Sequence, residues 1–259
     1  MLVEQILNDI TDEFMEYTSF DIMPPCTVLA INFNTPFLIY MLVKSLAQWK
    51  IKNLKLVIGD AGTNKLPEVH DAHMYGLEIT VKHIPSNIYA DIDSIPLIPN
   101  CNNYASYRHS RNIQWMLDNV IDTDVVMLVD SDVVFDKPGL ADYISKMQYY
   151  DVIGSIRHPA NYNPRIAPWQ CLFKKTILAK YNIRWDDPLH MMYINDNFVD
   201  DTGNTLYRAI LKNKLRFFEI HEGTLNTHLK GGSYDTAKYN AFCNQYALYI
   251  ANLKLQPSI

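Results

Sequence analysis

The chain has 259 residues, of which 48% are hydrophobic and 20% are charged, and its formal net charge is -5. This amount of apolar material can form one large core, and the acidic balance disfavours nonspecific nucleic-acid binding, which requires positive charge. No apolar run approaches the roughly 20 residues that a membrane-spanning helix needs, so we expect a cytoplasmic protein without a membrane span.

The four cysteines are far apart in the sequence and form no close pair of the kind found in zinc or redox motifs. We therefore interpret them as reduced structural thiols. Residues 1–24 combine apolar positions at helical spacing with several acidic residues, which predicts an N-terminal helical extension and not a signal peptide.

Strands and helices alternate through the first half of the chain. Cys26 to Phe33 is a short apolar strand, and a turn beginning at Asn34 leads into a helical pattern over 37–49. Two further strands are predicted over 53–60 and 77–84. This alternation predicts an α/β fold in which helices flank a central, mostly parallel sheet.

The most strand-like stretch of the chain follows a predicted loop over 85–103 and a predicted helix over about 104–120. It covers 124–129, is continuously apolar, as a central parallel strand should be, and ends in Asp130-Ser131-Asp132. Because ligands of open parallel sheets bind outside the carboxyl ends of the strands, this abrupt appearance of charge predicts a site there.

In the second half of the chain, the predicted strands and helices alternate less regularly. The predicted elements are a helix near 139–148, a strand over 151–156, an irregular aromatic stretch ending at Trp169, helices near 174–181 and 199–212, a strand over 215–220 and a last helix from about Thr236. No internal repeat or flexible linker divides the chain, so we predict a single domain over 1–259.

Asp130 and Asp132 are the first candidate metal ligands. Two residues apart in an extended chain, their side chains project from one face and can address a single Mn²⁺ or Mg²⁺ ion, with substrate phosphate oxygens completing the shell. His228 is the candidate third ligand, because imidazole is acceptable to Mn²⁺. The structural alternative is an acidic turn at the end of a strand.

The residues that follow His228 suit a diphosphate. Lys230 offers a cation, Gly231-Gly232 flexible backbone amides and Ser233 a hydroxyl group. The alternative is an ordinary turn before the final helix.

Five segments carry a resemblance to a known family. They are LAINFNTP, VIGDAGTN, YRHSRNIQWML, DVVMLVDSDVVF and WDDPLHMMYINDNFVDDTGNTLYRAI, within roughly residues 26 to 230. In this order they resemble the motifs of the family 2 glycosyltransferases. The resemblance implies a GT-A (Rossmann-like) fold with an acceptor-side lobe in its second half, and transfer of a sugar from a nucleoside-diphosphate donor to an acceptor hydroxyl.

The resemblance also implies roles for residues of the donor site. Asp60 would contact the nucleotide base, and Asn32 and Asn34 would border the nucleoside pocket. Asp130 would face the ribose or the metal, with Asp132 as the direct metal ligand. By the same analogy Arg111 would face the donor phosphates, although an arginine on an amphipathic helix is more often a solvated or salt-bridged surface residue.

Asp201 would be the general base that deprotonates the acceptor hydroxyl, and attack opposite the diphosphate would invert the anomeric configuration. Asp200 precedes it where the family usually has Glu, which is a departure from the pattern. The structural alternative for both is a helix N-terminus, where carboxylates meet unpaired amide groups. The polar and aromatic stretch 156–170 occupies the place of acceptor-binding segments, or else its Trp169 only fills the core.

These inferences predict a glycosyltransferase domain in which 25–135 is the nucleotide-binding half, 136–235 the acceptor and catalytic half, and 236–259 a C-terminal helix. The expected acceptor is a glycan, with a protein or a hydroxylated nucleic-acid base as alternatives; no oligomeric state is predicted.

Three alternatives remain. A sugar nucleotidyltransferase typically has a Gly-rich, basic first loop, which INFNTPFL lacks. A haloacid-dehalogenase-like phosphatase would use Asp130 as its nucleophile, but normally carries that strand near the N-terminus. A noncatalytic binding module would have eroded metal or base positions, which here are intact.

Overall fold

The computed structural model describes residues 23–62, 66, 76–90, 103–159, 163–187 and 201–229. The strands are β1 (Cys26–Asn32), β2 (Leu54–Asp60), β3 (Glu78–His83), β4 (Val125–Asp130), β5 (Val133–Val134), β6 (Val152–Arg157), β7 (Arg165–Lys174), β8 (Phe217–Glu219) and β9 (Thr227–His228). The helices are α2 (Pro36–Ala47), α3 (Asn103–Asn119), α4 (Leu140–Lys146), α5 (Lys175–Tyr181) and α6 (Asn204–Asn213), with a 3₁₀ turn η1 (Ser86–Tyr89).

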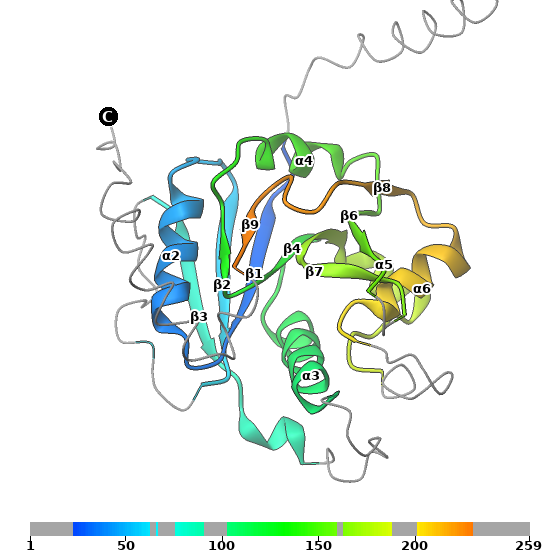
Figure 1. The fold of residues 1–259 in the computed structure, drawn as a ribbon, viewed down its shortest axis with the longest axis horizontal. Helices are drawn as coiled ribbons and strands as arrows, with labels where there is room; N and C mark the ends of the chain where they lie inside the picture. Colours follow the sequence, from blue (N-terminus) through cyan, green and yellow to red (C-terminus); the bar gives the residue numbers. More distant parts are fainter. Residues whose placement is uncertain are drawn as a thin grey trace, which may run out of the picture.

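A seven-stranded sheet in the order β3-β2-β1-β4-β7-β6-β8 forms the centre of the molecule (Figure 1). β7 is antiparallel to its neighbours β4 and β6, and the other adjacent strands are parallel. The predicted α/β fold with a mostly parallel sheet is thus confirmed. β5 and β9 form a separate antiparallel pair.

Helices cover both faces of this sheet. One core contains Leu42 of α2 and Ile144 of α4, and the other contains Ile113 of α3 with Leu206 of α6. Because both faces are covered, β1 is buried at every position, which explains its continuously apolar sequence. Among the described residues, no helix is long and apolar enough to cross a membrane.

The chain turns sharply where β1 ends. Asn34 adopts a left-handed conformation with φ 57°, which asparagine tolerates better than most residues. Pro36 then begins α2 at a position where its fixed φ suits a helix and its missing N–H is not needed. This turn places Asn32 and Asn34 at the carboxyl edge of the sheet.

The prediction of an irregular stretch ending at Trp169 is wrong. Residues 165–174 form β7, which lies between β4 and β6. This strand contains Pro168, although proline is uncommon in central strands because it cannot donate to the hydrogen-bond ladder. The β6–β7 register shifts between Gly154 and Ile156, and β4 pairs with residues 171–174 of β7, so Pro168 lies where the ladder is interrupted.

Other boundaries differ by a few residues. α6 begins at Asn204 because Gly203, with φ +100°, interrupts the helical conformation, and the predicted strand over 215–220 contains the shorter β8. The two-residue strands β5 and β9 were not predicted. Cys26 and Cys171 are buried and free, as expected for structural thiols, and burial raises the pKa of Cys26 to about 12. The predicted terminal helices, Cys101 and Cys243 lie outside the described residues.

Candidate functional site

The carboxyl ends of β1, β2 and β4 meet at one edge of the sheet and carry the predicted donor-site residues. Asn32 lies opposite Asp60 in the β1–β2 register, and Asp130 lies opposite Ile31 in the β1–β4 register. Sequence positions about a hundred residues apart thus become neighbours because the strands are parallel and adjacent. This is the edge at which parallel α/β sheets bind ligands.

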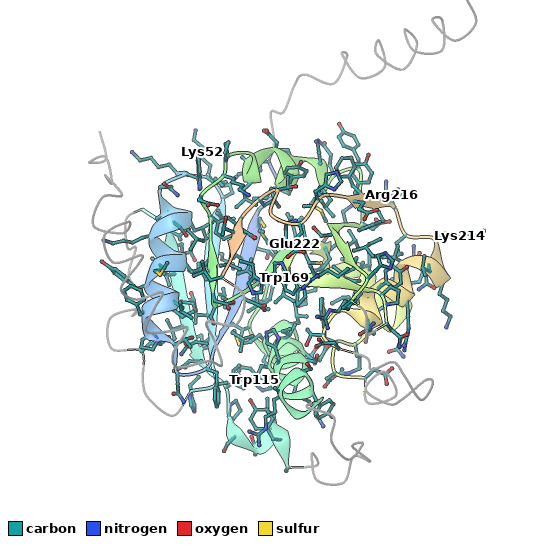
Figure 2. The ribbon with its side chains drawn as sticks, in the orientation of Figure 1. Lys52, Trp115, Trp169, Lys214, Arg216 and Glu222 are labelled. Atoms are coloured by element: carbon teal, nitrogen blue, oxygen red, sulfur yellow. The ribbon has the colours of Figure 1, made fainter. Side chains whose placement is uncertain are left out.

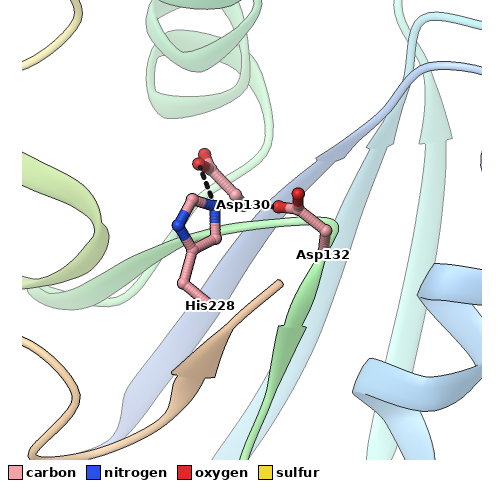
Figure 3. Close-up of side chains that lie close together, drawn as sticks. All are labelled: Asp130, Asp132 and His228. Atoms are coloured by element: carbon pink, nitrogen blue, oxygen red, sulfur yellow. Dashed lines mark hydrogen bonds and ion pairs between the residues drawn. The ribbon is translucent and has the colours of Figure 1, made fainter. Parts of the chain in front are cut away.

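Asp130, Asp132 and His228 form a cluster at this edge (Figure 3). Their potential ligand atoms lie within 4.8 Å of one another. His228 Nε2 is 3.1 Å from Asp132 Oδ1 and 3.5 Å from Asp130 Oδ2. For metal bonds of about 2.1 Å, neighbouring octahedral ligands lie about 3.0 Å apart, so the spacing suits one small divalent ion.

The β5–β9 pair brings His228 to the two carboxylates. Val133 pairs with His228 across these strands, and the Leu229 amide donates to the Asp132 carbonyl at 2.9 Å. A two-residue strand immediately after the acidic turn therefore positions a histidine 96 residues further along the chain. The cluster thus depends on a contact that no local pattern predicts.

The carboxylates of Asp130 and Asp132 repel each other and have little contact with solvent. Burial and the charge of Asp132 raise the pKa of Asp130 to about 7, against the opposing effects of His228 and Arg165. Burial acts to lower the pKa of His228, but the hydrogen bond and charge of Asp132, with the charges of Asp130 and Glu222, outweigh it and raise that pKa. A bound cation would stabilise both carboxylates in their ionised form.

His109 is a further imidazole at this cluster and was not among the predicted site residues. Its Nε2 atom, on α3, is 3.9 Å from Asp130 Oδ1. Burial lowers the pKa of His109 to about 4, only partly opposed by the charge of Asp132, so the ring is neutral at pH 7. In the sequence, this position was indicated only by a histidine in the YRHSRN segment, on the helix that faces the acidic end of β4.

Asn32 and Asp60 form a buried polar pair beside the cluster. The Asn32 amide nitrogen donates to Asp60 Oδ1 at 2.8 Å, and the same carboxylate oxygen accepts the Gly62 amide at 3.1 Å. Asn32 Oδ1 accepts from the backbone amide and the hydroxyl group of Thr35, whose hydroxyl also lies 3.3 Å from Ser131 Oγ. A continuous chain of contacts therefore links the ends of β2, β1 and β4.

Phe33 and Asn34, in the turn after β1, form a polar and aromatic rim beside this pair. Phe33 is 54% exposed and is one of three exposed large hydrophobic side chains among the described residues. A Cβ atom added to Gly62 would lie 2.8 Å from Asn34 Oδ1 and 3.0 Å from the Asn34 backbone nitrogen, so glycine allows the two loops to approach closely. Asn34 therefore faces the β2 loop beside Asp60.

Asp201 lies in a network of donors at the start of α6. Its Oδ1 atom accepts from Ser106 Oγ at 2.5 Å and from the Thr202 amide at 2.7 Å, and Oδ2 forms an ion pair with Arg165 of β7. The Asp201 amide in turn donates to Asn204 Oδ1. Thr202 precedes the N-cap Gly203, and α6 has no side-chain cap hydrogen bond, so the carboxylate does not make the helix-terminus contact of the structural alternative. Arg165 also acts electrostatically on Asp130.

Arg111 contacts residues of its own helix and of the segment after α5. Its Nε atom donates to Tyr107 Oη at 2.8 Å and lies 3.8 Å from Asp186 Oδ2. The guanidinium group also lies over the Tyr107 ring, 5.2 Å from its centroid. The ion pair with Asp186 agrees with the alternative interpretation of Arg111 as a salt-bridged residue.

Trp169 is 5% exposed and belongs to the core, yet it also touches the cluster. Its ring stacks on the His228 ring, with centroids 4.4 Å apart and an angle of 12° between the planes. Arg157 lies over the same tryptophan at 5.1 Å and forms an ion pair with Glu222 at 3.4 Å. Of the remaining predicted site residues, Asp200, Lys230 and Ser233 lie outside the described residues.

Comparisons with known proteins show a similarity of fold without a close relative in sequence. No protein-family profile matches the chain, and no curated protein matches it significantly. Among solved structures, TarS 1-349 of S. aureus is 14% identical with a TM-score of 0.53, covering 89% of this chain and 66% of its own. Mannosyltransferase PcManGT from Pyrobaculum calidifontis, in complex with GDP-Man and Mn²⁺, is 14% identical with a TM-score of 0.51, covering 90% and 64%.

The galactosyltransferase LgtC, in complex with donor and acceptor sugar analogs, is 12% identical with a TM-score of 0.50. That match covers 90% of this chain and 98% of LgtC. The chain thus spans slightly under two thirds of TarS 1-349 and of PcManGT, and nearly all of LgtC. It has the GT-A fold.

Proposed function

We propose that this chain is a metal-dependent glycosyltransferase that moves a sugar from a nucleoside-diphosphate donor to an acceptor hydroxyl. The observation that carries the proposal is the gathering of Asp130, Asp132 and His228 at the carboxyl edge of the sheet. The buried Asn32–Asp60 pair beside this cluster supports it, because a nucleotide needs polar recognition next to its phosphates. The GT-A fold is consistent with it.

Asp130, Asp132 and His228 would hold the ion, since the two carboxylates suit Mn²⁺ or Mg²⁺ and the imidazole is acceptable to Mn²⁺. When bound, the ion supplies charge neutralisation for the diphosphate leaving group. PcManGT was solved with GDP-Man and Mn²⁺, which supports this pairing of donor and metal. Lys230 and Ser233 are proposed to contact the same diphosphate.

The nucleoside would lie against the ends of β1 and β2. Asp60 would accept hydrogen bonds from the base, Asn32 would hold the Asp60 carboxylate in place, and Asn34 would border the pocket. The exposed ring of Phe33 offers an apolar surface at the same rim. Arg111 is proposed as a contact of the donor phosphates, which would require it to leave Asp186.

Asp201 is proposed as the general base, with Asp200 beside it in sequence. An acceptor hydroxyl that displaces Ser106 from Oδ1 would donate its proton there as its oxygen attacks the anomeric carbon. Arg165 would keep the carboxylate oriented through Oδ2 during this step. Attack from the side opposite the diphosphate gives inversion of configuration.

The acceptor is proposed to be a glycan or another hydroxyl-bearing molecule, with a protein or a modified nucleic-acid base as further candidates. The stretch 156–170 is proposed to bind the acceptor. It includes Arg157 and Arg165, which lie opposite each other in the β6–β7 register. A phosphatase that uses Asp130 as nucleophile is less well supported, because β4 is preceded by three of the seven strands of the large sheet.

A panel of nucleotide sugars tests the proposal. The purified protein is incubated with UDP-, GDP-, CDP- and TDP-linked sugars, with Mn²⁺ or with EDTA, and release of nucleoside diphosphate is followed by chromatography. We expect one donor class to be consumed only with metal. Consumption that is unaffected by EDTA, or hydrolysis of a general phosphatase substrate in place of the donors, would contradict the proposal.

A further inference from the structure

The imidazole of His228 is fixed from one side by the carboxylates and from the other by an aromatic ring. The edge that carries Nε2 faces Asp132 and Asp130, and the face of the ring lies on Trp169. Figure 2 shows Trp169 near the middle of the molecule, and the ring is almost fully buried. The stacking partner therefore cannot move away without opening the core.

Within the described residues, His228 lacks the hydrogen bond that usually orients a metal-binding histidine. Its Nδ1 atom is buried and has no hydrogen-bond partner in the described part of the chain. Metal-binding histidines commonly donate this second N–H to a carboxylate or a carbonyl group, which fixes the orientation of the ring. Here the flat contact with Trp169 restrains the ring plane.

Trp169 is itself held against the segment that leads to His228. The Asn226 side chain donates to the Trp169 carbonyl at 2.9 Å. The adjacent Gln170 side chain donates to Ser155 Oγ and to the His221 carbonyl, and accepts the Leu225 amide at 3.1 Å. β7 thus fixes this segment through a backbone carbonyl, an amide side chain and an aromatic face.

We infer that Trp169 is a positioning residue for the metal centre, holding the His228 imidazole in its metal-binding orientation by stacking. Metal binding draws electrons from the imidazole and gives the ring partial positive charge, which the electron-rich face of tryptophan stabilises. The stack therefore favours the metal-bound ring in addition to restraining it. The inference rests on the proposed function, because it gives Trp169 a role only if His228 binds a metal.

Mn²⁺ binding provides a test that does not depend on activity. Free Mn²⁺ is measured by electron paramagnetic resonance during titration of wild type, Trp169→Leu and Trp169→Phe. We expect Trp169→Leu to weaken Mn²⁺ binding about 10-fold or more, in the range found for residues that orient metal ligands. Trp169→Phe keeps an aromatic face and should bind within about 3-fold of wild type.

Trp185→Leu is the matched control. Trp185 is 3% exposed, packs against Phe173 at 5.6 Å, and like Trp169 has a buried Nε1 atom without a partner in the described residues. It belongs to the opposite core. Its replacement should lower the unfolding temperature without changing the affinity for Mn²⁺, which separates positioning from general loss of packing.

The outcomes distinguish this inference from the proposed function. Wild-type protein that binds no Mn²⁺ would overturn both. Wild type that binds Mn²⁺, with Trp169→Leu binding as tightly or Trp185→Leu weakened equally, would overturn the role of Trp169 alone. If Trp169→Leu does not fold, Trp169→Met supplies a longer, more flexible side chain that adapts to the same space without an aromatic face, and it is expected to show the same loss.

Discussion

At the scale of single residues, the site gathers negatively charged side chains at the carboxyl edge of the sheet. The charge of Asp132 raises the pKa of Asp130, and Arg165 is the described cation that acts on Asp130 and forms an ion pair with Asp201. Such a group of carboxylates is unfavourable unless a cation joins it. The chemistry of each residue is therefore best tested by removing one charge at a time.

Asp132→Asn removes a ligand charge while keeping the size of the side chain. Because even residues outside the first coordination sphere contribute about 10–100-fold to metal affinity, we expect Mn²⁺ binding to fall by at least about 100-fold. The measurement is Mn²⁺ titration with circular dichroism as the check on folding. Asp142→Asn on α4, outside the cluster, is the control; an Asp132→Asn protein with wild-type affinity would exclude Asp132 as a ligand.

Asp201→Asn tests the proposed base. Asparagine can still accept from Ser106 and Thr202 through its carbonyl oxygen, but it cannot take a proton. We expect donor turnover to fall about 10²–10⁴-fold, the usual contribution of general base catalysis, while nucleotide binding with Mn²⁺ is retained. Undiminished turnover would assign Asp201 to the structural role at the start of α6.

At the scale of elements, the position of the proposed base depends on how closely α6 approaches β7. Gly203 precedes α6 with φ +100°, and a Cβ atom there would lie 2.1 Å from the Ile166 carbonyl oxygen. The Ile166 amide donates to the Gly203 carbonyl at 3.4 Å. Glycine thus permits a backbone contact that places Asp201 beside Arg165.

Gly203→Ala should therefore destabilise the protein by about 2 kcal/mol or more, since strain at positive φ adds to the clash with Ile166. Urea unfolding measures the effect. Gly76→Ala is the matched control, because Gly76 has φ +78° but nothing within 4 Å of an added Cβ. If both variants lose the same stability, the close approach of Gly203 to β7 makes no contribution.

Asp151, just before β6, joins three strands and should give the fold an acid-sensitive contact. Its carboxylate accepts from the backbone amide and the side chain of Arg216, and lies 3.8 Å from Lys174 Nζ. Burial acts to raise the pKa of Asp151, but the hydrogen bonds and charge of Arg216, with the charge of Lys174, outweigh it and hold that pKa below its usual value.

A carboxyl group whose pKa is lower in the folded state stabilises the fold above its unfolded pKa and loses that contribution as pH falls through the folded pKa. Asp151→Asn should thus be less stable than wild type at pH 7, with the difference shrinking below about pH 4. Thermal unfolding of both proteins across this range measures it; a difference that stays constant with pH would contradict the account.

At the scale of the whole molecule, the sequence predicted what depends on continuous apolar strands. β1, β2 and β4 were recognisable because both their faces are buried, and their carboxyl ends located Asn32, Asp60 and Asp130. The α/β class and the mostly parallel sheet followed from the alternation of strands with helices.

Contacts between distant segments were not predictable in the same way. β7 was missed because Pro168 lies in a central strand, and its register is interrupted at that point. The stack of Trp169 on His228 and the ion pair of Arg165 with Asp201 arise only when β7 meets segments that follow it in the chain. The sequence identified candidate residues by their type, but their contact partners depend on the folded sheet.

The most direct test of the central claim is thermal stabilisation by UDP, GDP, CDP and TDP, each with and without Mn²⁺, in wild type and Asp132→Ala. A ligand at about 100 times its Kd adds about 2.7 kcal/mol, which should raise Tm by about 5 °C or more in a chain of this size. The account predicts that one nucleotide stabilises wild type only with Mn²⁺ and does not stabilise Asp132→Ala. Stabilisation by none of them, or equal stabilisation of the variant, would contradict it.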